Sequence, residues 1–163
     1  MSRQVTELEG VLQLMIDEHR RMLATVIAQQ TAMKTLKLDA MQDAMHRQES
    51  SRMRIANLDM RRRLLAQQIA KLSRVNGEMS LTQVATVFPQ SGPKLLKLRD
   101  ELKGLIKQIA DRTHVAGRVA AAVLGHLNTA MRLFAGAVGQ AGVYTKHGTP
   151  RVANRIGVMD AIG

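Results

Sequence analysis

Three stretches of the chain place apolar residues at alternating steps of three and four, the heptad register of helices that pack side by side. In the middle stretch, polar residues hold three positions of the same register. The apolar members there are Met41, Ala44, Ile55, Leu58, Leu65, Ile69 and Leu72, and the polar members are Gln48, Ser51 and Arg62. The last stretch comprises Leu95, Leu98, Leu102, Leu105, Ile109, Ala116, Val119, Val123, Ala130, Leu133 and Ala137, with Arg112 and His126 in phase. Registers this long predict an all-α fold.

The first long helix is predicted from about Gln4 to about Lys34. Its inward positions are Val5, Leu8, Leu12, Met15, Met22, Val26 and Met33, with His19 and Gln29 in the same phase. Residues 36–38 are too few for more than a tight turn, so the second helix should run antiparallel to the first. Asp39 is the predicted N-cap of that second helix, which should end near Asn76 and Gly77.

A capping-box pattern, Ser80-Leu81-Thr82-Gln83, predicts a short helix that ends at about Phe88. Pro93 suits the first position of the third long helix, which should run to about Gly139. We therefore predict an all-α fold: an antiparallel bundle of three long helices with one short connecting helix and a flexible C-terminal tail. The expected domains are a helical bundle at 1–139 and the tail at 140–163.

Glycines interrupt the third long helix, and each costs about 1 kcal/mol relative to alanine in a helix interior. They are Gly104, Gly117, Gly125 and Gly136. The second half of this helix should therefore be its less stable half. Gly117, Ala121 and Gly125 form a strip that either lets another helix approach closely or is an alanine-rich solvent face.

The composition favours an aliphatic, methionine-rich core, since the chain has eleven methionines and only 2% aromatic residues. It has no cysteine, which excludes disulfides and thiolate metal sites. The N-terminal residues lack the apolar run of a signal peptide, and charged or polar residues interrupt the most apolar region, 115–141. We expect a soluble, cytoplasmic protein.

The net charge of +11 favours an anionic partner, whether nucleic acid, anionic lipid or an acidic protein. The strongest nucleic-acid signal is the triplet Arg61-Arg62-Arg63, preceded by Arg52 and Arg54. Aromatic residues that would stack on bases are missing around it. A solvated basic helix face is therefore the favoured interpretation.

Two Asp-x-x-His pairs resemble the ligand pairs of di-metal bundles, namely Asp43 with His46 and Asp111 with His114. Both pairs fall at heptad positions c and f, which point away from the seam. The sequence also lacks paired inward carboxylates, a phosphate-binding glycine loop and a nucleophile-histidine-acid pattern. We expect no enzyme activity, no metal and no cofactor.

The order of these parts resembles the flagellar export chaperones of the FlgN class. The resemblance covers nearly the whole chain and rests on several short stretches. They are Glu18-His19-Arg20-Arg21, Leu38-Asp39-Ala40-Met41, the charged segment from Glu49 to Arg63, Ser80-Leu81-Thr82-Gln83, and Tyr144-Thr145-Lys146-His147-Gly148. The chain departs from the family pattern in its more basic charge and in its continuation from Arg151 to Gly163.

The resemblance implies a cytoplasmic, non-enzymatic chaperone that holds the terminal helices of hook-filament junction proteins before secretion. It implies that Tyr144 docks the complex on the export gate; the other interpretation is a tyrosine folded back onto the bundle end. For the cargo groove we predict the apolar residues in the second half of the last helix: Val119, Val123, Leu127, Leu133 and Phe134. The alternative function is a basic coiled-coil protein that binds nucleic acid or an anionic membrane surface.

Overall fold

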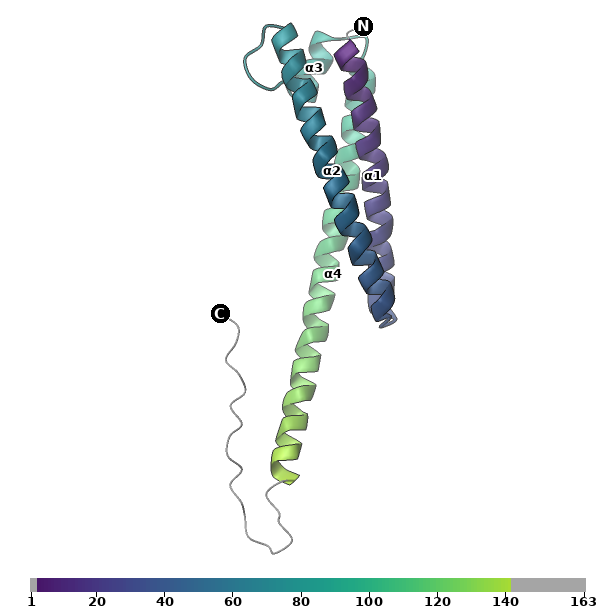
Figure 1. The fold of residues 1–163 in the computed structure, drawn as a ribbon, viewed down its shortest axis with the longest axis vertical. Helices are drawn as coiled ribbons and strands as arrows, with labels where there is room; N and C mark the ends of the chain where they lie inside the picture. The colour runs from purple at the N-terminus through teal and green to yellow at the C-terminus, as the bar shows by residue number, and fades with distance from the viewer. Residues whose placement is uncertain (1–2, 142–163) are drawn as a thin grey trace, which may run out of the picture. The chain divides into compact units, whose positions relative to one another are not determined.

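Four helices make up the part of the chain that the structure, a computed structural model, describes (residues 3–141; side chains to residue 136). They are α1 (Arg3–Lys34), α2 (Leu38–Leu72), α3 (Leu81–Val87) and α4 (Gly92–Ala141) (Figure 1). No strand occurs in residues 3–141, which confirms the predicted all-α bundle. The chain divides into two compact units, residues 1–117 and 118–163. Because residues 142–163 lie outside the described part, the boundary predicted at 139/140 stays a prediction.

Polar contacts between α1 and α2 fix their relative direction. As residue numbers rise along α1, those of the partners on α2 fall, so the two helices are antiparallel, as predicted (Figure 1). The pairs are Glu7 with Arg61 at 2.6 Å, Glu18 with Ser51 at 2.7 Å, and Gln29 with Gln48 at 2.7 Å.

The first part of α4 runs parallel to α1, because the numbers of their paired residues rise together. These pairs are Glu9 with Lys94, Arg20 with Glu101, and Gln30 with the carbonyl of Arg112. Residues 3–117 therefore form an up-down-up arrangement of three helix segments, with α3 in the connection between the last two.

The main core lies where the first half of α1 meets the end of α2, α3 and the start of α4. Its members are Val5, Leu8, Val11, Leu12, Met15, Ile16, Leu65, Ile69, Ala70, Met79, Val84, Leu95, Leu98, Leu102 and Leu105. The predicted inward positions of α1 are buried or half-buried. In α2 the polar register member Ser51 is fully buried, whereas Leu72 is exposed at the helix end, where the prediction of a core position is wrong.

The predicted N-cap of α2 is also wrong. The helix begins at Leu38, so Asp39 lies inside its first turn, and the N-cap is Lys37, whose side chain makes no capping hydrogen bond. In the turn between α1 and α2, Leu36 adopts a left-handed conformation with a φ of 52°. The Lys37 amide donates to the Ala32 carbonyl at 3.0 Å, which satisfies a free carbonyl of the last turn of α1 without a glycine.

The end of α2 comes four residues earlier than Asn76. The Val75 amide donates to the Ala70 carbonyl at 2.9 Å and the Arg74 amide to the Lys71 carbonyl at 3.2 Å. These two bonds form a Schellman motif around Arg74, whose φ is 55°. Because an arginine rather than a glycine takes the left-handed position, the sequence pattern pointed to the wrong residue.

The capping box of α3 is confirmed. The Ser80 hydroxyl accepts from the Gln83 amide at 3.3 Å, and the Gln83 side chain accepts from the Ser80 amide at 2.8 Å. The helix α4 begins at Gly92, one residue before Pro93. A Cβ atom on Gly92 would lie 2.9 Å from the Ala85 carbonyl oxygen, so the turn into α4 requires a glycine there.

Within residues 3–141, no helix is both long enough and apolar enough to cross a membrane.

Candidate partner-binding surface

The heptad register of α4 has two environments. From Leu95 to Ala116 the apolar members of the register are buried, and Arg112 is the one register member of that stretch that is exposed. From Val119 onward every described member is exposed. The register is therefore continuous in the sequence, but its members belong to the core only as far as Ala116.

All five predicted cargo-binding residues are exposed, from 38% for Val123 to 76% for Phe134. Two further large apolar residues, Leu124 and Met131, are exposed on the same stretch. At about 100° per residue the seven side chains span roughly half of the helix circumference, with Val123, Leu127 and Phe134 near the centre. We call this surface the α4 apolar face: Val119, Val123, Leu124, Leu127, Met131, Leu133 and Phe134.

The sequence prediction included Leu127 and Phe134, which lie beside the a/d positions, but it missed Leu124 and Met131, which lie further round the same side of the helix. The broader 3.6-residue period would have found them, since Ala120, Leu124, Leu127, Met131 and Phe134 also follow steps of three and four. The opposite side of the helix carries Arg118, Asn128 and Arg132. No acidic residue occurs between Arg112 and Ala141, so this amphipathic segment is basic on its polar side.

The glycines of this segment are not required by packing. A Cβ atom at Gly117, Gly125 or Gly136 would meet nothing within 4 Å. Ala121, the third member of the predicted small-residue strip with Gly117 and Gly125, is exposed as well. The predicted docking residue Tyr144 lies outside the described residues.

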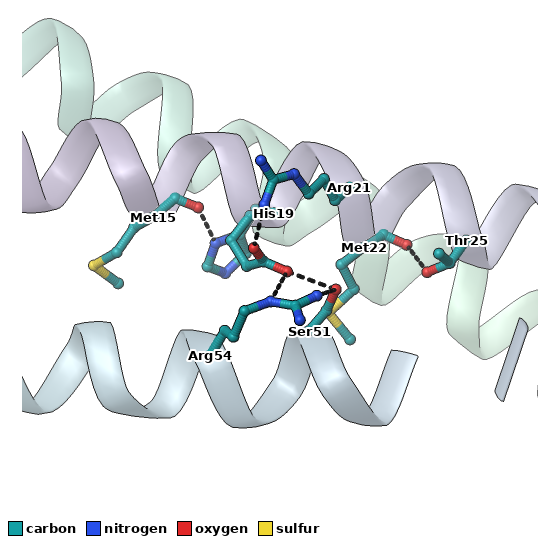
Figure 2. Close-up of polar contacts among 8 residues, drawn as sticks. Met15, His19, Arg21, Met22, Thr25, Ser51 and Arg54 are labelled. Atoms are coloured by element: carbon teal, nitrogen blue, oxygen red, sulfur yellow. Dashed lines mark hydrogen bonds and ion pairs between the residues drawn. The ribbon is translucent and has the colours of Figure 1, made fainter. Parts of the chain in front are cut away.

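A buried carboxylate ties α1 to α2, which the sequence analysis did not anticipate. Glu18 is only 4% exposed and accepts hydrogen bonds from the Ser51 hydroxyl at 2.7 Å and from Arg54 Nε at 2.9 Å. Arg21 reaches its second oxygen at 3.1 Å. Figure 2 shows Arg21 on α1 and Ser51 and Arg54 on α2 converging on this carboxylate. The available signal was Ser51, a polar residue in an apolar register.

The pKa of the Glu18 carboxyl lies below its ordinary value. Burial by itself raises this pKa, but the hydrogen bonds from Ser51 and Arg54 and the charges of Arg54 and Arg21 outweigh it. Glu18 is therefore a structural anion whose charge is fully compensated at neutral pH. Its bonding partners are those of a structural contact between two helices rather than those of an acid catalyst.

His19, predicted on the seam, is buried and bonded within its own helix, with Nδ1 at 2.7 Å from the Met15 carbonyl (Figure 2). The two Asp-x-x-His pairs lie on exposed surface. Asp43 pairs with Arg47 at 2.9 Å and Asp111 with Lys107 at 3.6 Å. Across residues 3–141, no three His, Cys, Asp or Glu side chains are grouped as metal ligands.

Each arginine of the basic triplet has a carboxylate partner. Arg61 bonds Glu7 at 2.6 Å, and Arg63 bonds Asp59 at 2.9 Å. Arg62 lies between Asp59 at 2.8 Å and Glu78 at 3.3 Å. Much of the positive charge that suggested a phosphate-binding face is thus compensated within the bundle.

A helical bundle joined to an exposed amphipathic segment is characteristic of a protein that binds other proteins through helix packing. The comparison with protein families agrees with this class. The family model described as FlgN protein matches residues 1–151, and the chain belongs to that family. The family consists of flagellar export chaperones, not enzymes, so the chain's role is that of a chaperone in flagellar assembly. No curated protein and no solved structure matches the chain.

Proposed function

We propose that the protein binds the terminal helices of hook-filament junction proteins through the α4 apolar face. In this proposal it acts in the cytoplasm, prevents premature assembly of those proteins and delivers them to the type III export gate. The observation that carries the proposal is the exposure of seven large apolar side chains on one side of a single helix segment.

The energetics suit a helical cargo. Burying one Val, Leu, Met or Phe side chain contributes about 1.5–3 kcal/mol. Seven such side chains supply a gross term on the order of 10 kcal/mol, which is comparable with the rigid-body cost of association, about 4–15 kcal/mol. Binding should therefore depend on the α4 apolar face as a set, and a charge at its centre should abolish it. An amphipathic cargo helix seated there would have its own apolar side chains covered, so it could not use them to polymerise.

The first test compares two single variants, each of which introduces one negative charge at a different position of the same helix segment. Val123→Asp puts a carboxylate in the centre of the α4 apolar face, and Asn128→Asp puts one on the polar side. We expect Val123→Asp to weaken binding of a synthetic cargo terminal helix by at least about 100-fold, because the charge must be desolvated. Helical circular dichroism should stay nearly unchanged, since Val123 is already partly exposed. Unchanged cargo affinity in Val123→Asp, or an equal loss in Asn128→Asp, would refute the assignment.

The second test concerns Tyr144, which we propose as the export-gate docking residue on the basis of the family resemblance. A single tyrosine supplies a large contact area at low side-chain entropy cost. Tyr144→Ala should leave the melting temperature and cargo affinity unchanged but lose binding to the export-gate component and reduce secretion of the junction proteins. Tyr144→Phe keeps the ring and removes the hydroxyl, so this variant tests which of the two groups the export-gate component needs. A lower melting temperature with gate binding retained would show instead that Tyr144 is part of the folded core.

The alternative function, binding of nucleic acid or an anionic membrane, has less support because Arg61, Arg62 and Arg63 all have carboxylate partners. We expect only non-specific association with duplex or single-stranded nucleic acid, with a Kd no tighter than about the micromolar range at physiological salt. Phosphate-driven binding also weakens steeply with ionic strength, whereas binding of an apolar helix does not. A titration at two salt concentrations distinguishes the two functions.

A further inference from the structure

A groove runs along the surface between α1 and α2, separate from the α4 apolar face. It consists of two adjoining hollows of about 520 and 210 Å³ that share Ala24, Thr25 and Arg47. On α2 the lining extends from Ala40 to Arg54, which is about 21 Å at 1.5 Å per residue. This length fits a helix of about four turns. We call it the α1–α2 groove.

The floor of the α1–α2 groove consists largely of small side chains, and His46, Ser50 and Ser51 complete the lining of its larger hollow. Ala24 and Ala28 come from α1, and Ala40 and Ala44 from α2. The hydroxyl of Thr25 is bonded to the Met22 carbonyl of its own helix at 2.8 Å, which leaves the floor without a free hydroxyl at this position (Figure 2). Small residues at a contact allow helix axes to approach closely. The floor is therefore shaped for a third helix whose own contact residues are small or aliphatic.

The rim of the groove is basic. Arg21, Arg47 and Arg54 line it and are all more than half exposed. Each guanidinium carries five N–H donors. Arg21 and Arg54 direct their described bonds to Glu18 and Ser51, and Arg47 bonds Asp43. Three cations against two carboxylates leave the rim positive, with N–H donors free for an incoming anion.

We propose that the α1–α2 groove docks an acidic helix of a partner protein, with small or aliphatic residues on the floor and carboxylates against Arg21, Arg47 and Arg54. Charge complementarity supports this occupant, and the chain's charge of +11 attracts such a partner over longer range. A protein helix fits better than nucleic acid. The lining offers a single ring, the imidazole of His46, among alanine and serine side chains, whereas single strands are held by stacking successive bases on several aromatic rings.

The test uses the full-length protein and a synthetic helix of about four turns, labelled for fluorescence anisotropy. The helix carries an alanine-leucine stripe flanked by glutamates, and a second helix has every glutamate replaced by glutamine. We expect the glutamate helix to bind and the glutamine helix to bind at least about tenfold more weakly. Equal binding of the two, or no binding of the glutamate helix, overturns the proposal.

Two charge reversals on α2 locate the site. Arg47 and Arg63 are matched, since each is exposed and each bonds the aspartate four residues before it at 2.9 Å. Only Arg47 lines the groove. Arg47→Glu should weaken binding of the glutamate helix at least about tenfold, whereas Arg63→Glu should change it by less than about twofold. An equal loss in both variants would show a general charge effect and overturn the assignment to the groove.

A third variant fills the floor without changing charge. Ala28 is exposed, so Ala28→Trp should fold normally, yet its ring would occupy the space meant for the docked helix. We expect at least about tenfold weaker binding of the glutamate helix, with an unchanged melting temperature. Unchanged affinity would refute a seated helix. A labelled duplex oligonucleotide is titrated directly in the same assay, and oligonucleotide binding that is lost in Arg47→Glu but not in Arg63→Glu would assign the groove to nucleic acid instead.

Discussion

The helix α4 carries one apolar period through two different environments. Between Leu95 and Ala116 the register is covered by α1, α2 and α3, whereas between Val119 and Phe134 the same kind of register is exposed. The two stretches differ little in their apolar residues but clearly in what lies beside them. A heptad register thus indicates that a face has to be covered, and it does not indicate whether the cover comes from the chain itself. In an export chaperone, the uncovered stretch is the place where we propose the cargo binds.

The largest expected effect comes from making the same substitution, leucine to alanine, in each of the two stretches. Leu98→Ala should lower the free energy of unfolding by about 2–5 kcal/mol, because Leu98 is only 7% exposed in the main core. Leu127→Ala should change it by less than about 0.5 kcal/mol, since Leu127 is 56% exposed. Urea unfolding followed by circular dichroism measures both. A comparable loss in Leu127→Ala would show that the second stretch packs onto the bundle.

The next effect concerns acid. The pKa of Glu18 is lowered from its ordinary 4.5 and that of Asp59 from 3.8. Both carboxylates belong to the bundle, whereas residues 112–141 of α4 contain no carboxylate. The folded state therefore binds these protons less tightly than the unfolded state. Their contribution is fully present above the ordinary values and is lost as the pH falls through the lowered ones.

Glu18→Gln removes the more buried of these two carboxylates. It should cost about 1–3 kcal/mol at pH 7, because Arg21 and Arg54 lose their shared anion. The difference from the unchanged protein should shrink as the pH is lowered below 4.5. Thermal melting across this pH range is the measurement, and an equal difference at every pH would argue against a charged Glu18 in the fold.

The smallest effect compares two glycines of α4. A Cβ atom at Gly104 or Gly125 would meet nothing within 4 Å, so alanine should stabilise the helix at either position by up to about 1 kcal/mol. In Gly104→Ala the gain should raise the melting temperature of the bundle. In Gly125→Ala it should instead slow hydrogen exchange of the amides around residue 125, with the melting temperature unchanged. A higher melting temperature in both would mean that α4 unfolds as one unit.

The sequence predicted the helices and most of their inward residues, because the burial of α1 and α2 follows a simple period. The end of α1 at Lys34 was predicted correctly. The two ends of α2 were harder to place, since its N-cap Lys37 makes no side-chain capping bond and Arg74 adopts a left-handed conformation that is usually taken by glycine. The capping box at Ser80 was predictable because its two hydrogen bonds are local. The bonds from Glu18 to Ser51 and Arg54 on α2 join residues 33 or more positions apart, and periodicity carries no information on such pairs.

For the candidate site, the sequence located the stretch and five of the seven residues of the α4 apolar face. Leu124 and Met131 were missed because the exposed apolar face extends further round the helix than the a/d positions and their immediate neighbours. The α1–α2 groove could not be predicted from the sequence, because it depends on how alanines from two helices meet. The arginines of the groove are evident in the sequence, but the residues that they bond in the folded protein are not.

The buried carboxylate of Glu18 also determines how α1 and α2 are aligned. Apolar heptads look alike one repeat further along, so a slide of seven residues, about 10 Å, would still match apolar side chains with apolar side chains. After such a slide Glu18 would face a residue other than Ser51 and lose Arg54, and an unpaired buried charge is strongly destabilising. The pair Gln29 and Gln48 adds a second point of the same kind. Two polar contacts thus give a repetitive interface a single alignment, which keeps the α1–α2 groove and its arginines in a fixed arrangement.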